Sequence, residues 1–121
     1  MAEHNDFGKM GEEMAQKHLL AKGYKIIATN WRFGKDEIDI VAMHNSFLVI
    51  VEVKTRSTNF FGDPEEAVTN KKKKFLVRAA DAYINIHNVA EEVRFDIISI
   101  VVTGPHWEIN HIEDAFYPTI N

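Results

Sequence analysis

The sequence contains no cysteine in its 121 residues. Disulfides and thiolate metal sites are therefore excluded. No apolar run approaches the roughly 20 residues that a membrane-spanning helix requires, and the N-terminal M-A-E-H-N-D lacks the basic and apolar regions of a secretory signal. These absences predict a cytoplasmic protein.

An excess of basic charge is missing as well. The formal net charge is −4 and the sequence pI is about 5.8, which argues against a protein that coats nucleic acid through bulk charge. A local basic patch beside an acidic site is still compatible with this balance. The basic residues are in fact unevenly spread, because residues 71–74 are consecutive lysines.

The composition is typical of a folded globular protein. Hydrophobic residues make up 45% of the chain and charged residues 26%, which argues against disorder. No internal repeat or low-complexity linker divides the sequence. We therefore expect one domain over residues 1–121, a usual size for a single hydrophobic core.

The hydrophobic pattern predicts two helices and five strands in the order α-β-β-β-α-β-β. Helices are expected over Asp6–Lys22 and about Thr69–His87, strands over Tyr24–Phe33, Glu37–Met43, Phe47–Lys54, Arg94–Val102 and Trp107–Ile112, and a loop over Ser57–Glu66. The third strand contains F-L-V-I-V, which is apolar on both faces and therefore central. Because the second helix can connect the third and fourth strands as a parallel crossover, the fold class is α/β (α+β), a mixed sheet flanked by helices.

Charges within the apolar strands are the main functional signal. Side chains in a strand alternate between its two faces. Glu37 and Asp39 are therefore expected on one face of the second strand, with Ile38 and Ile40 on the other. The third strand carries a similar pattern, because E-x-K follows its apolar run.

Glu52 and Lys54 share a face of the third strand by the same rule. If the second and third strands pair as a hairpin, Asp39 and Glu52 can converge, and two close carboxylates repel each other unless a cation lies between them. Oxygen ligands without His or Cys favour Mg²⁺ or Mn²⁺. Lys54 would point into the same site, where it could orient a water nucleophile and stabilise charge on a phosphate.

A less specific interpretation treats Glu52 and Lys54 as an exposed ion pair, which is the more frequent arrangement for an arbitrary E-x-K on a strand. The apolar run before Glu52 argues against it, because an isolated charge on a central strand is costly. Together with the upstream D-E-I-D segment, this context favours the metal site.

Other charged residues flank these strands. Glu12 lies at the edge of the apolar stripe of the first helix, where it could reach the sheet or remain solvated. Thr69 can cap the second helix, which places Lys71 and Lys72 in its first turn. Cations there oppose the helix dipole, so they indicate either a docked phosphate or a solvated basic run. Arg56 is a further candidate phosphate ligand, or a surface arginine.

Segments through nearly the whole chain resemble the YraN family of bacterial proteins. They follow the family's order: G-E-E-M-A at 11–15, G-Y-K-I-I-A-T-N-W-R at 23–32, E-I-D-I-V-A at 37–42, V-E-V-K-T-R at 51–56, F-G-D-P-E-E-A-V-T at 61–69, R-F-D-I-I at 94–98 and H-I-E-D-A-F at 111–116. The family is similar to the PD-(D/E)xK nuclease superfamily, whose folds include Holliday-junction resolvases and restriction endonucleases. The resemblance therefore implies a restriction-endonuclease-like fold.

The resemblance also implies roles for the matched positions. Asp39 matches the metal-binding aspartate of the superfamily, and Glu52 and Lys54 match its E-x-K. Glu12 matches the acidic residue of the first helix, and Lys72 matches a recurrent basic position at the start of the second helix.

Two positions depart from the pattern. Ile38 replaces the proline that names the superfamily motif, a substitution that the superfamily often tolerates. Asp36 stands where the family commonly has glycine before E-I-D, so it could alter the turn or add a ligand to the metal.

The resulting hypothesis is a metal-dependent endonuclease. Asp39, Glu52 and the backbone carbonyl of Val53 would hold Mg²⁺ or Mn²⁺, Lys54 would position the attacking water, and Glu12 would complete the acidic shell. The nucleic acid, DNA in preference to RNA, would be bound by a separate set of basic residues, namely Arg56, Lys71 and Lys72.

Two alternatives from other functional classes stay open. One is a catalytically inactive nucleic-acid-binding module on the same fold, and the other is a protein-interaction domain, which the acidic pI leaves open. A homodimer is also open, because many relatives in the superfamily act as dimers on two-fold substrates. No membrane partner is expected.

Overall fold

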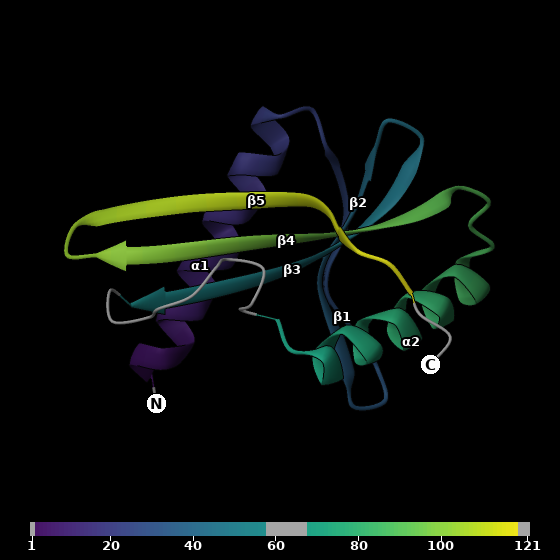
Figure 1. The fold of residues 1–121 in the computed structure, drawn as a ribbon, viewed down its shortest axis with the longest axis horizontal. Helices are drawn as coiled ribbons and strands as arrows, with labels where there is room; N and C mark the ends of the chain where they lie inside the picture. The colour runs from purple at the N-terminus through teal and green to yellow at the C-terminus, as the bar shows by residue number, and fades with distance from the viewer. Residues whose placement is uncertain (1, 58–67, 119–121) are drawn as a thin grey trace.

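The computed structural model of the protein describes residues 2–57 and 68–118 (Figure 1). Within these ranges lie two helices and five strands, namely α1 (Ala2–Ala21), β1 (Lys25–Phe33), β2 (Asp36–His44), β3 (Phe47–Ser57), α2 (Asn70–His87), β4 (Glu92–Thr103) and β5 (His106–Phe116). This order confirms the predicted α-β-β-β-α-β-β arrangement. Of the loop predicted over Ser57–Glu66, Ser57 is the last residue of β3, and the other positions lie outside the described residues.

The five strands form one mixed sheet in the spatial order β1-β2-β3-β4-β5. Neighbouring strands are antiparallel except β3 and β4, which are parallel and are connected through α2. The predicted parallel crossover and the central position of β3 are therefore confirmed. The turn between β2 and β3 takes the left-handed backbone of a tight hairpin, with Asn45 at φ 49° and Ser46 at φ 71°.

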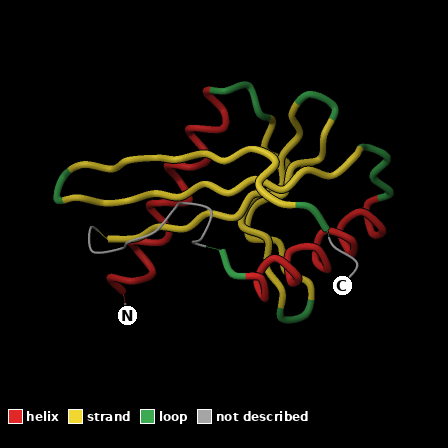
Figure 2. The backbone as a smooth tube through the Cα atoms, in the orientation of Figure 1, coloured by secondary structure: helices red, strands yellow, loops and turns green. Residues whose placement is uncertain are grey.

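The two helices cover opposite faces of the sheet, and Figure 2 shows α1 behind the strands and α2 in front of them. Alternate residues of β3 belong to different hydrophobic clusters. Val49 and Val51 pack in the α1 cluster, whereas Leu48 and Ile50 pack in the α2 cluster. Because the alternation continues along β3, Glu52 lies on the face that α2 covers. Among the described residues, no helix is long and apolar enough to cross a membrane.

Helix α1 approaches β3 closely at Gly11. A Cβ atom built on Gly11 would overlap the hydroxyl of Thr55, so only glycine allows this separation. The contact places the next residue, Glu12, beside the C-terminal half of β3. A single glycine therefore sets how near an acidic residue of α1 comes to the sheet.

The C-terminal end of α1 is fixed by a buried polar network. Asp96 is fully buried and accepts hydrogen bonds from Arg94 Nε at 3.0 Å and from the Tyr24 hydroxyl at 3.0 Å. His111 Nε2 lies 2.8 Å from Asp96, and the other nitrogen of His111 lies 3.1 Å from His18 of α1. Burial alone would raise the pKa of Asp96, but the hydrogen bonds from His111 and Arg94 outweigh it and lower the pKa to about 2.

Candidate metal centre at the fork of the sheet

The sheet divides between β2 and β3. These strands pair only from Ile40–Val51 to His44–Phe47, whereas β1 and β2 stay paired as far as Phe33–Asp36. Residues 30–39 therefore leave the sheet as a two-stranded arm, here named the β1–β2 arm. Figure 1 shows this arm running away from β3, β4 and β5, with the first turn of α2 near the opening between them.

Asp39 lies where the strands separate. Its Oδ2 atom accepts a hydrogen bond of 2.8 Å from the backbone N–H of Val53. That N–H lies beyond the last β2–β3 pair, so the carboxylate replaces the missing strand partner. The side chain of Asp39 is thereby fixed against the backbone of β3, next to Glu52.

The expectation that Ile38 and Ile40 share one face is wrong. Ile38 packs in the α2 cluster and Ile40 packs in the α1 cluster. The β1 residue across from Asp39 is Asn30, between the pairs Thr29–Ile40 and Trp31–Ile38, and it has a left-handed φ of 50°. This irregularity breaks the simple alternation, and asparagine is one of the few residues that accept it readily.

Asn30 also links the fork to α1. Its Nδ2 atom donates a hydrogen bond of 3.1 Å to Glu12 Oε1. Burial raises the pKa of Glu12, and the negative charges of Asp39 and Glu37 raise it further, although the Asn30 hydrogen bond opposes the rise. Within the described residues no group of three or more His, Asp or Glu could hold a metal ion, so Glu12 lies beside the Asp39–Glu52 pair without completing a ligand set.

Glu52 is the most perturbed carboxylate of the fork. Only 5% of the residue is exposed. Burial raises its pKa to about 8, with a further contribution from Asp39 and opposing contributions from Lys72 and Lys54. Burial also raises the pKa of Asp39. The fork therefore holds one buried and one half-buried carboxylate, Glu52 and Asp39, whose simultaneous ionisation is unfavourable in the protein alone.

Two buried oxygens near this pair lack a hydrogen-bond partner within the described part of the chain. They are Glu52 Oε1 and Ser99 Oγ. Ser99 is the β4 neighbour of Lys54 in the parallel register, so both oxygens belong to adjacent strands. Buried polar atoms almost always have partners. An oxygen-only donor set with an orphaned carboxylate oxygen fits a hard divalent cation such as Mg²⁺ or Mn²⁺.

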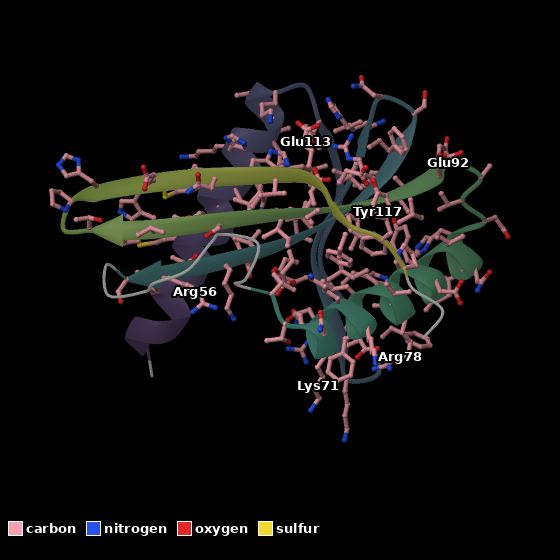
Figure 3. All side chains as sticks on the ribbon, viewed as in Figure 1. Arg56, Lys71, Arg78, Glu92, Glu113 and Tyr117 are labelled. Carbon is pink, nitrogen blue, oxygen red and sulfur yellow. The ribbon has the colours of Figure 1, made fainter. Side chains whose placement is uncertain are left out.

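The predicted basic residues fall at different distances from the pair. Lys72 is nearest, with its Nζ atom 3.7 Å from Glu52 Oε2. The predicted cap of α2 is confirmed, because Thr69 Oγ1 accepts a 3.1 Å hydrogen bond from the backbone N–H of Lys72. Lys71 is exposed and extends outward from α2, whereas Arg56 is half-buried near the end of β3 (Figure 3).

Asp36 contacts α2 instead of the Asp39–Glu52 pair. It is 6% exposed, and its two carboxylate oxygens accept hydrogen bonds of 2.8 and 2.9 Å from Arg78 of α2. Arg78 and Asp36 therefore join the end of the β1–β2 arm to α2 through a bidentate pair. The sequence left open that Asp36 adds a ligand to a metal. In the structure both of its carboxylate oxygens bind Arg78 instead.

Sequence reasoning missed Asn30, Gly11 and Ser99. A polar residue between β-branched and aromatic strand residues was the only local signal for Asn30, and nothing local indicated its contact with Glu12. The close approach at Gly11 and the buried hydroxyl of Ser99 depend on segments far apart in the sequence. These three positions shape the fork without belonging to the E-x-K pattern.

Comparisons with known proteins point to one family over most of the chain. The model of "Uncharacterised protein family UPF0102" matches residues 11–100. A UPF0102 protein of Phocaeicola vulgatus is 51% identical over 120 residues, covering 99% of each chain. A UPF0102 protein of Bacteroides thetaiotaomicron is also 51% identical over 120 residues, again covering 99% of each chain. One of Flavobacterium psychrophilum is 49% identical over 117 residues, covering 97% of this chain and 98% of the relative.

Proposed function

This chain belongs to the UPF0102 family, and we propose that it is a metal-dependent endonuclease of the PD-(D/E)xK type that hydrolyses phosphodiester bonds of nucleic acid. DNA is the favoured substrate over RNA. The observation that carries the proposal is the pair of buried Glu52 and half-buried Asp39, with both pKa values raised and Glu52 Oε1 without a partner among the described residues. A divalent cation would stabilise the ionised form of both carboxylates, which burial disfavours in the protein alone.

The residues of the fork divide into distinct roles. Asp39, Glu52 and the carbonyl of Val53 would hold Mg²⁺ or Mn²⁺, and Glu12 would complete the acidic shell. When bound, such a cation stabilises charge on the phosphate and makes water more acidic. Lys54 shares a strand face with Glu52 and lowers the pKa of Glu52, and its ammonium would orient a water molecule and a phosphate oxygen.

A local basic surface would hold the nucleic-acid backbone despite the acidic net charge. Lys71 and Lys72 lie in the first turn of α2, where the helix dipole also favours a phosphate. Lys72 contacts Glu52 across 3.7 Å, so a cation between the carboxylates would free its ammonium for a phosphate. Arg56 extends this surface along β3.

The proposal is tested by cleavage of branched, single-stranded and duplex DNA in Mg²⁺ or Mn²⁺. Asp39→Asn, Glu52→Gln and Lys54→Met should each reduce the rate by about 100-fold or more, because each removes a group that stabilises the transition state. Chelation should abolish cleavage. Glu113→Gln is the matched control, since Glu113 is exposed and pairs with Lys22. Equal rates in all variants would assign any cleavage to a contaminant.

A binding module without turnover is the second candidate. It is favoured by the lack, among the described residues, of a ready set of three acidic or histidine ligands. This alternative predicts salt-dependent nucleic-acid binding that survives Asp39→Asn, with no cleavage under any metal condition. The same set of variants therefore separates the two functions.

A further inference from the structure

An exposed aromatic row lies on the β1–β2 arm. Phe33 is 45% exposed at the end of β1, and its ring is nearly parallel to that of Trp31, with centroids 6.1 Å apart and an angle of 4°. Trp31 in turn makes an edge contact with Tyr83 of α2 at 5.1 Å. The row therefore begins in the core at Tyr83 and ends in solvent at Phe33.

The row is held rigidly. Tyr83 is 4% exposed, so the inner end of the row is fixed by the α2 cluster. The outer end is fixed by the bidentate contact between Arg78 and Asp36, because Asp36 is the strand partner of Phe33. A rigid exposed ring loses little conformational entropy when a flat ligand stacks on it.

Cations surround the outer end of the row. Arg32 precedes Phe33 with 77% of its side chain exposed and lies 3.7 Å from Glu37 in a solvent-exposed ion pair, and Lys35 lies exposed in the turn. Lys71 and Arg78 of α2 lie toward the same end of the arm in Figure 3. An aromatic ring flanked by positive charge matches a nucleobase joined to phosphates, whose π-face stacks while the backbone contacts cations.

The arm also places Phe33 near the candidate metal centre. Its strand partner Asp36 lies three residues before Asp39 on the same strand. At the rise of a β-strand this separation is roughly 10 Å, which is about the span of two or three nucleotides. A base stacked on Phe33 would therefore belong to the strand whose phosphate lies at the fork.

We infer that the β1–β2 arm binds an unpaired nucleobase close to the phosphate at the fork, so that the substrate class is nucleic acid with a single-stranded segment at the cleavage point. A base inside a duplex cannot offer its face to Phe33 without leaving the stack. The inference rests on the proposed function and adds a preference that Asp39, Glu52 and Lys54 do not provide.

The test measures binding without metal, so that cleavage is not required. Fluorescence anisotropy in a chelator compares a duplex containing a short single-stranded gap with the same duplex fully paired. Phe33→Ala should weaken binding to the gapped DNA by roughly 10- to 100-fold, and should leave binding to the full duplex unchanged. Ile27→Ala is the matched control, because Ile27 lies on the same strand and is 44% exposed.

Two further variants separate stacking from general hydrophobicity. Phe33→Tyr keeps a flat ring and should bind gapped DNA like the wild type, whereas Phe33→Leu should bind like Phe33→Ala. In a Trp107→Phe background, gapped DNA should also quench the fluorescence of Trp31. Binding of both DNAs with no difference among the Phe33 variants overturns this inference alone. No binding of any nucleic acid by the wild type overturns the proposed function together with it.

Discussion

The metal-free protein should become more stable when Glu52 is replaced by glutamine. The pKa of Glu52 is raised from 4.5 to about 8, mainly by burial and then by Asp39. A folded-state pKa above the unfolded value means that the folded protein must hold a proton which the unfolded chain releases. Its contribution to stability is therefore complete below pH 4.5 and is lost as the pH rises to about 8.

The size of the effect follows from this difference. Each pH unit between the two pKa values lowers the free energy of unfolding by about 1.4 kcal/mol. At pH 7 the loss is roughly 3 kcal/mol, since neutrality lies about 2.5 units above the ordinary pKa. Glutamine carries no titrating proton and can donate its amide to Asp39, so Glu52→Gln should be about 3 kcal/mol more stable than the wild type at pH 7.

Urea unfolding in a chelator, repeated across this pH range, measures the difference. The wild type should lose stability steadily toward pH 8, whereas Glu52→Gln should follow a flatter curve. Glu113→Gln is a control in which stability should change in the opposite direction. Lys22 lowers the pKa of Glu113, so the charged form of Glu113 is the stabilising one and its loss should not stabilise the protein. Equal or lower stability of Glu52→Gln at pH 7 would refute the idea that the pair is strained without a cation.

Three further predictions concern the surroundings of the pair. Asn30→Gly keeps the left-handed backbone but removes the amide that holds Glu12. Calorimetry should show about 10-fold weaker Mn²⁺ binding at an unchanged melting temperature, and unchanged affinity would contradict this role of Asn30. Gly11→Ala should lower stability by about 1–3 kcal/mol in thermal unfolding despite the better helix propensity of alanine, because the new Cβ overlaps Thr55; a more stable variant would contradict it. Asp96→Asn should lower the free energy of unfolding by about 2 kcal/mol at pH 7, because the charged form of Asp96 is favoured down to a pKa of about 2. In urea unfolding this deficit should shrink as the pH falls through about 4, and a deficit independent of pH would contradict the role of the charged carboxylate.

Local patterns in the sequence were enough to predict the helices, the strands and their order. The apolar segment from Phe47 onward identified the central strand, and Thr69 identified the start of α2. These features depend on neighbours within a few residues, because periodicity and capping are local. The side-chain faces of β3 followed from the same local rule.

The fork could not be predicted in the same way. Its geometry depends on the left-handed backbone of Asn30 and on the hydrogen bond from Val53 to Asp39, which replaces strand pairing. Alternation of side chains between the two faces holds only where a strand is regular. The strand is irregular here, so Ile38 and Ile40 lie on opposite faces. The contact between Asp36 and Arg78 was hidden for another reason, because its partners are 42 positions apart.

The most direct test of the proposed metal centre is a titration of Mn²⁺ followed by electron paramagnetic resonance, in which the signal of free Mn²⁺ falls on binding. One site per chain is expected in the wild type. Its affinity should be higher at about pH 8 than at about pH 6, because the cation must displace the proton held by Glu52. The site should be lost in Asp39→Asn and Glu52→Gln and retained in Glu113→Gln. Retention of the site in Glu52→Gln, or no binding by the wild type, would contradict the account.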